Sequence, residues 1–243
     1  MNLWLNLSNL GDVATTGIVA AMIAAGLAFG QTRRAAVLWC VLMAIEIALV
    51  VTSKIAFLGW GWGICSLDFT GFSGHATRAM TIYPVLFHLV LNRASHARQG
   101  AGILLGVALG LAVGVSRLAL HVHSPSEIAA GWMLGGGIAF LFIWIGKDLK
   151  SFELKKYATL IGVLMLSVLP APEAGATQKL LVDLSIFFSG HVSAFSRQNC
   201  GANKLEKNVI TMTPTVEHLR GIIFVIRPGG QAYALKFPKD VLV

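Results

Sequence analysis

The chain has 243 residues, of which 56% are hydrophobic and only 12% are charged, and its mean hydropathy is +0.73. Because an average soluble domain carries about 25% charged residues, this composition excludes a soluble globular protein and predicts an integral membrane protein. The formal net charge of +8 does not indicate nucleic-acid binding, because much of the basic excess lies in short connections between apolar runs.

Six apolar stretches follow one another along the chain. They cover Val13–Phe29, Ala35–Ser53, Ala76–Leu91, Ala101–Val115, Ile128–Ile145 and Tyr157–Leu169. A spanning helix needs about 17–25 apolar residues, so the first five stretches predict spans and the sixth leaves a span or an interfacial piece open. Residues Met1–Leu10 lack the basic start of a signal peptide, so we expect the first stretch to stay in the mature protein. The predicted fold class is all-α, a polytopic transmembrane helix bundle of five to six spans.

Basic residues alternate between the connections that join these stretches. Those after the first, third and fifth stretches are Arg33, Arg34, Arg93, Arg98, Lys147, Lys150, Lys155 and Lys156. The other connections hold only Lys54 and Arg117. Positive charge marks the cytoplasmic side of a bacterial inner membrane, so we expect Lys54, Arg117 and the loops around them to lie on the opposite face.

The composition changes after Leu169. Pro170-Ala171-Pro172 punctuates the chain, and the residues that follow are polar and basic and include no spanning run. We therefore expect a membrane-embedded domain over residues 1–170 and a polar tail over residues 171–243. Ile222–Ile226 and Ala232–Phe237 read as a hairpin, and because a lone hairpin is marginally stable, we expect this tail to be poorly ordered.

Two short polar strings lie beside the apolar stretches. Ser73-Gly74-His75 precedes the third stretch, and this places it at a helix N-terminus, where free N–H groups and the helix dipole attract anions. The second string has Ser116-Arg117 at the end of one helix and His123 and Glu127 at the start of the next. Since the arginine fork fits phosphate oxygens and histidine can attack phosphorus, the two strings indicate phosphate chemistry.

These strings resemble the motifs of the type 2 phosphatidic acid phosphatase family, whose site is shared with vanadium-dependent haloperoxidases. The family pattern Ser-Arg, five residues, His, three residues, Asp is matched from Ser116, with Glu127 in place of the aspartate. The pattern Pro-Ser-Gly-His is matched with Phe72 in place of proline. The pattern Lys, six residues, Arg-Pro is matched only at Lys54, because Gly61-Trp62 occupies the Arg-Pro position.

The resemblance implies a role for each matched residue. His123 would be the nucleophile that forms a phosphohistidine, and Glu127 would hold its other ring nitrogen. His75 would protonate the leaving oxygen and then activate water. The residues that would bind the phosphoryl oxygens are Lys54, Ser73, Gly74 and Arg117. The resemblance implies neither a metal nor a cofactor.

Some of these residues have other interpretations. Ser124, Pro125 and Glu127 form a capping-box pattern, a role that can coexist with catalysis. Lys54 at a helix end can also snorkel toward the membrane surface. Arg78 lies inside an apolar run one turn beyond His75, where its charge is a candidate replacement for the missing arginine.

The function that the resemblance implies is a membrane phosphatase without a metal. Candidate substrates are an isoprenoid pyrophosphate, phosphatidic acid or phosphatidylglycerol phosphate, so the expected partners are membrane lipids and not nucleic acid. Two alternatives stay open. One is a non-catalytic scaffold or transporter with a decayed phosphate site, which the absent Arg-Pro favours. The other is a lipid phosphotransferase, which would use the same phosphohistidine.

Overall fold

The computed structural model divides the chain into two compact units, Met1–Phe195 and Ser196–Val243. The structure describes residues 2–29, 33–91, 94–146, 174–191, 193–197, 222–226 and 232–236. The predicted sixth apolar stretch, Tyr157–Leu169, and the predicted domain boundary at residue 170 lie outside these residues. That boundary stays a prediction.

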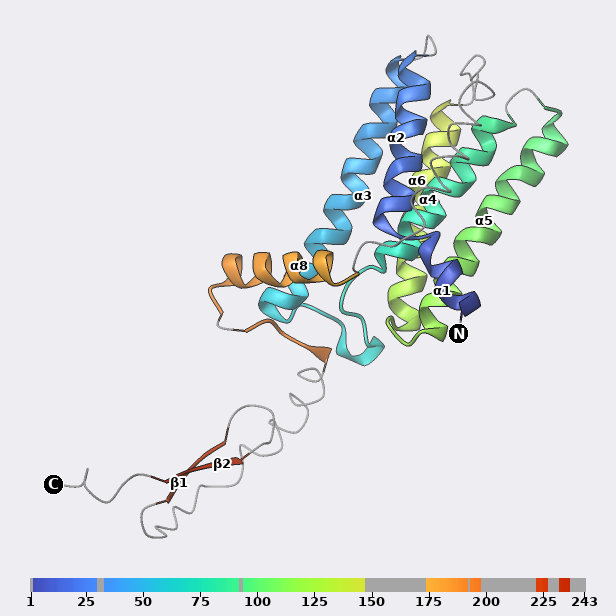
Figure 1. The fold of residues 1–243 in the computed structure, drawn as a ribbon. Coiled ribbons are helices and arrows are strands. Elements are labelled where there is room, and N and C mark those ends of the chain that lie inside the picture. Colours follow the sequence, from blue (N-terminus) through green and yellow to red (C-terminus); the bar gives the residue numbers. More distant parts are fainter. Residues whose placement is uncertain are drawn as a thin grey trace. The chain divides into compact units, whose positions relative to one another are not determined.

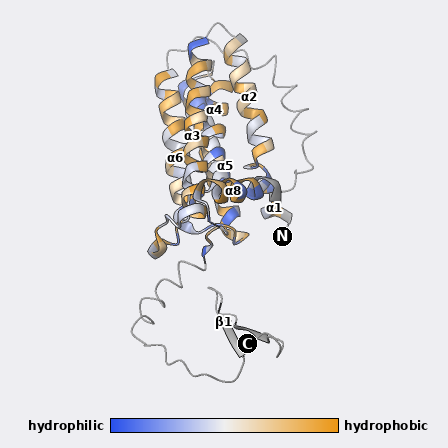
Figure 2. Ribbon diagram, turned by 90° about the vertical axis from the view of Figure 1, so that its left-hand side faces the viewer, coloured by the Kyte–Doolittle hydropathy of each residue, from blue (hydrophilic) through white to orange (hydrophobic). Residues whose placement is uncertain are grey.

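The first unit is built from helices (Figure 1). Its described helices are α1 (Asn2–Asn9), α2 (Val13–Phe29), α3 (Arg33–Trp60), the 3-10 turn η1 (Cys65–Leu67), α4 (Gly74–Val90), α5 (His96–Ala119), α6 (Pro125–Ile145) and α8 (Ala174–Ser189). Among the described residues, four segments are long and apolar enough to cross a membrane: Leu3–Ala28, Arg33–Trp60, His96–Ala119 and Pro125–Ile145. The third predicted span, which lies in α4, is not one of them. Hydrophobic residues cover most of the length of α2, α3 and α6 (Figure 2). The predicted all-α bundle of an integral membrane protein is confirmed.

Helix α4 packs against α2, α5 and α6. Glycines let the neighbouring helices approach it closely. A Cβ atom added at Gly106 of α5 would lie 2.5 Å from the backbone of Pro84, and one at Gly135 of α6 would lie 2.3 Å from the carbonyl oxygen of Thr77. Since Cβ atoms cannot approach so closely, these glycines serve helix packing, as small residues commonly do in membrane bundles.

The end of α3 differs from the boundary expected from hydropathy. Helix α3 continues from the predicted end at Ser53 to Trp60, so Lys54 and Gly59-Trp60 lie within it. The helix stops at Gly61, whose φ of +70° favours a residue without a Cβ. Hydropathy underestimated the length of α3, because backbone hydrogen bonds can continue a helix past the end of its apolar run.

Helix α8 packs against α3 within the first unit. Just beyond its end, His191 Nδ1 lies 2.7 Å from the carbonyl oxygen of Gly59, and the backbone N–H of Phe195 donates to the carbonyl of Leu58 over 2.8 Å. A Cβ at Gly61 would lie 3.1 Å from the ring of Phe195. His191 and Phe195 therefore anchor this segment to the end of α3.

The described part of the second unit is a two-stranded antiparallel sheet. Strand β1 (Ile222–Ile226) pairs with β2 (Ala232–Lys236), and the register joins Ile222 to Lys236 and Ile226 to Ala232. The predicted hairpin is therefore present, and its second strand ends one residue earlier than expected.

Candidate active site

The predicted site residues come from four helices that meet at one end of the bundle. Lys54 lies on α3, Ser73-Gly74-His75 at the start of α4, Arg117 in the last turn of α5, and His123 just before α6. His75 is within electrostatic range of Arg117, Arg78, His123 and Lys54. The structure thus brings the two polar strings and Lys54 into one cationic cluster.

His123 and Glu127 are joined directly at the start of α6. His123 Nδ1 lies 2.7 Å from Glu127 Oε2, and the Glu127 side chain is 1% exposed. The other carboxylate oxygen, Oε1, accepts the backbone N–H of Thr70 over 3.0 Å and also the Thr70 hydroxyl. Because an ionised carboxylate only accepts hydrogen bonds, Nδ1 is the donor and Nε2 keeps a free lone pair.

Glu127 is also the N3 residue of a capping box. Its backbone N–H donates to Ser124 Oγ over 3.4 Å, and the Ser124 N–H donates to Glu127 Oε2 over 3.3 Å. The capping role and the contact with His123 therefore coexist. The cap fixes the carboxylate of Glu127 next to the imidazole of His123, which lies one helical turn earlier in the chain.

The local environment of His123 favours the neutral ring. Burial lowers its pKa below the ordinary histidine value, and the nearby Lys54 and Arg117 lower it further. The hydrogen bond that His123 donates to Glu127 and the negative charge of Glu127 act in the opposite direction. Because the lowering causes prevail, the Nε2 lone pair is available at neutral pH.

The start of α4 carries an unused hydroxyl. Ser73 is the N-cap residue and is fully buried, and its Oγ has no hydrogen-bond partner among the described residues. The Ser73 N–H donates to the carbonyl oxygen of Glu127 over 3.2 Å. A Cβ at Gly74 would lie 2.9 Å from Arg78 Nη1, so the guanidinium of Arg78 lies directly against this glycine.

Both arginines of the cluster contact the N-terminal segment. Arg117 Nη1 donates to Ser8 Oγ over 2.6 Å, and Arg78 Nη2 donates to the carbonyl oxygen of Gly11 over 3.2 Å. The Nε atoms of both arginines are buried without a partner among the residues that the structure describes. Each guanidinium is thus held in place while part of its donor set stays unused.

Lys54 faces the same cluster. It is partly buried and within electrostatic range of Arg78, Glu127 and Arg117. Gly71, with a φ of +140°, passes so close that a Cβ there would lie 3.2 Å from Lys54 Cγ. This placement agrees with phosphate binding better than with snorkelling, because a snorkelling lysine extends toward bulk water.

Some site residues were not found from the sequence. They are Ser8, Gly11, Asp12 and Thr70. Asp12 Oδ2 lies 3.9 Å from His75 Nε2. The sequence signal for Asp12 was an acidic residue directly before an apolar run, which indicates a helix cap and does not point to a histidine more than sixty residues away.

The comparisons with known proteins agree with the family resemblance that the motifs predicted. The model of the PAP2 superfamily matches residues 58–151, a range that includes His75, Arg117, His123 and Glu127. The predicted family resemblance is confirmed over these residues. Lys54 and the N-terminal segment lie outside the PAP2 match.

A relative and a solved structure were also found. The relative is an uncharacterized 22.5 kDa protein in the cps region of Klebsiella pneumoniae, 42% identical over 109 residues, which are 45% of this chain and 52% of that protein. The chain thus matches about half the length of this relative. The structure is the first transmembrane PAP2 type phosphatidylglycerolphosphate phosphatase from Bacillus subtilis, 20% identical with a TM-score of 0.49 over 63% of this chain and 79% of its own.

Proposed function

We propose that the protein is an integral membrane phosphatase that hydrolyses a lipid phosphate or an isoprenoid pyrophosphate through a phosphohistidine. The observation that carries this proposal is the 2.7 Å contact from His123 Nδ1 to the buried Glu127, beside a cluster of cations. An oriented, neutral imidazole with its free Nε2 near phosphate-binding groups is the arrangement that nucleophilic catalysis requires.

In the first proposed step, His123 Nε2 attacks phosphorus and forms the N–P bond. The bond from phosphorus to the leaving oxygen breaks, and His75 gives that oxygen a proton. In the second step, water attacks phosphorus while His75 takes a water proton, and the N–P electron pair returns to His123. Both histidines end as they began, so the cycle needs no metal and no external base.

The phosphoryl oxygens would be held by the cationic cluster and the start of α4. Lys54 and Arg117 supply charge, and the Ser73 hydroxyl and the Gly74 N–H supply donors at a helix N-terminus. The unused Oγ of Ser73 and the unused Nε of Arg117 support this assignment. Arg78 extends the set, because its guanidinium lies against Gly74. It thus supplies a positive charge in place of the family's arginine, whose position in the sequence Gly61 occupies.

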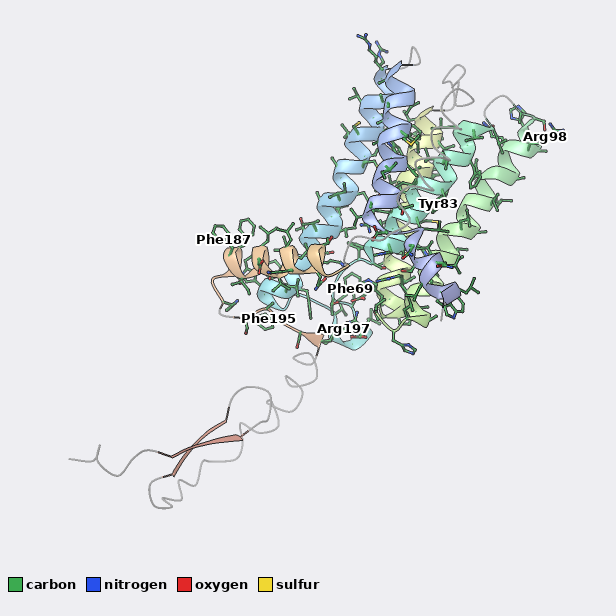
Figure 3. The ribbon with its side chains drawn as sticks, in the orientation of Figure 1. Phe69, Tyr83, Arg98, Phe187, Phe195 and Arg197 are labelled. Carbon is green, nitrogen blue, oxygen red and sulfur yellow. The ribbon has the colours of Figure 1, made fainter. Side chains whose placement is uncertain are left out.

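We further propose that this site faces away from the cytoplasm of a bacterial inner membrane. Arg98, at the start of α5, lies at the opposite end of the bundle from Phe69 (Figure 3). The start of α3, which holds Arg33 and Arg34, lies at the same end as Arg98 (Figure 1). Since positive charge marks the cytoplasmic side, the positions of these arginines support the proposed orientation.

The test is phosphate release by purified protein in detergent micelles from a panel of lipid phosphates and pyrophosphates. His123→Ala should lose nearly all turnover, and His96→Ala, at the exposed opposite end of α5, should keep it. A wild-type protein that folds normally but releases no phosphate from a broad panel would favour the scaffold. Transfer of labelled phosphate to a second lipid in place of water would favour the phosphotransferase.

A further inference from the structure

The segment Ser8–Asp12, which joins α1 to α2, lies on the candidate site although it is far from every motif in the sequence. It contacts three of the charged or ionisable residues there: Ser8 Oγ accepts from Arg117, the Gly11 carbonyl accepts from Arg78, and Asp12 lies beside His75. The segment therefore borders both the phosphate-binding groups and the proposed acid.

The two carboxylate oxygens of Asp12 have different surroundings. Oδ1 accepts the backbone N–H of Ala14 over 2.8 Å and so caps α2. Oδ2 lies 3.9 Å from His75 Nε2, which is too long for a hydrogen bond but short for a charge interaction. Asp12 Oδ2 thus faces His75 Nε2 without a hydrogen bond to it, and a proton on Nε2 is left free for transfer.

The charges around His75 explain why such a carboxylate matters. In the site without substrate, burial lowers the pKa of His75 to about 2, and the charges of Arg117, Arg78, His123 and Lys54 act in the same direction, so the imidazolium is disfavoured. Among the neighbouring carboxylates, Glu127 holds His123 and Glu46 lies within electrostatic range of Arg78. Asp12 lies within electrostatic range of both Arg78 and Arg117 and also beside His75. Asp12 is the carboxylate whose oxygen lies nearest to His75 among the contacts the structure describes.

The position of Asp12 is fixed from both sides. A Cβ at Gly11 would lie 2.6 Å from Val113 Cγ1 and 3.0 Å from the Cβ and carbonyl oxygen of His75, so the turn fits only with glycine there. The Tyr83 hydroxyl donates to the carbonyl of Leu10 over 2.6 Å. The carboxylate is therefore held beside His75 and does not depend on a flexible loop.

We propose that Asp12 is a positioning residue that keeps the acid His75 protonated when substrate is bound. This inference rests on the proposed function, in which His75 Nε2–H passes its proton to the leaving oxygen as the P–O bond breaks. Asp12 exchanges no proton itself in this step. A leaving oxygen of an alcohol needs that proton, whereas a nitrophenolate leaves without it.

The experiment compares wild type with Asp12→Asn on two substrates in the same micelles: a long-chain alkyl phosphate and a nitrophenyl phosphate carrying a similar alkyl chain. Asparagine caps a helix as well as aspartate does, so the substitution removes the charge and keeps the cap. Asp183→Asn, in an exposed position of α8, makes the same charge change away from the site and should leave both rates unchanged.

We expect Asp12→Asn to lower kcat for the alkyl phosphate by about 10-fold or more at neutral pH and to leave the nitrophenyl substrate within about 2-fold of wild type. The alkaline limb of the kcat profile for the alkyl phosphate should move to lower pH, because His75 loses its proton earlier. A purely structural role of Asp12 would change neither the pH of the alkaline limb nor the ratio of the kcat values for the two substrates.

Equal losses on both substrates, or no loss on either, would overturn the role of Asp12 while leaving the phosphatase proposal intact. If the wild type itself hydrolyses neither substrate nor any other lipid phosphate, the proposed function fails, and the role of Asp12 fails with it. Thermal unfolding of Asp12→Asn and of Asp12→Ser, which also keeps a capping side chain, separates a folding defect from a loss of acid catalysis.

Discussion

Replacing Glu127 with glutamine tests the nucleophile most directly. In the wild type, the two carboxylate oxygens accept from His123 Nδ1, the Thr70 N–H and hydroxyl, and the Ser124 N–H. A glutamine side chain has one acceptor and one donor group at these two positions. The backbone cap survives, because Ser124 Oγ still accepts the N–H of residue 127.

Either orientation of the amide is unfavourable. If its oxygen faces Thr70, the amide NH₂ donates to His123 Nδ1, and the ring proton moves to Nε2, where the nucleophilic lone pair has to be. If the oxygen faces His123, the NH₂ meets the Thr70 N–H, and a buried donor left unsatisfied costs about 1–3 kcal/mol. We therefore expect the wrong tautomer to dominate.

A wrong tautomer in a comparable catalytic triad lowers kcat about 10⁴-fold, so we expect Glu127→Gln to lose about 10³–10⁴-fold in kcat with little change in KM. The assay is single-turnover formation of acid-labile phosphohistidine from labelled substrate, followed by steady-state phosphate release. Glu127→Asp keeps the charge but shortens the reach to His123, so it should retain more activity than the glutamine variant. A Glu127→Gln protein within 10-fold of wild type would refute the assigned tautomer.

Further predictions concern protonation, phosphate binding and packing. Because burial lowers the pKa of His123, activity should persist below the ordinary histidine range and fall as the pH drops through the lowered pKa, which a kcat/KM profile measures. Arg117→Ala should reduce kcat/KM by about 100–1000-fold, and Arg78→Ala should reduce it less. Gly135→Ala should lower the unfolding temperature, since its Cβ would lie 2.3 Å from a backbone oxygen, and Gly137→Ala, with open space around it, should not.

The helix bundle and the motif residues were predictable because each leaves a local trace in the sequence. Long apolar runs predict helices directly, and the spacing of His123 and Glu127 places them one turn apart at a helix start. The contact between Asp12 and His75 leaves no such trace, since it depends on how the α1–α2 turn packs against α4 and α5. The packing of α8 on α3 was missed for the same reason, because its short apolar face gives no spanning signal.

The hydrogen bond from the Ser73 N–H to the Glu127 carbonyl joins the starts of α4 and α6. His75 follows this bond by two residues on one helix, and Glu127, which holds His123, accepts it on the other. The starts of α4 and α6 consequently form a common support for the two histidines, and this hydrogen bond couples their positions. Adapting such a protein to a new head group would have to proceed through the loops that border the support, because substitutions within it would disturb the chemistry together with the specificity.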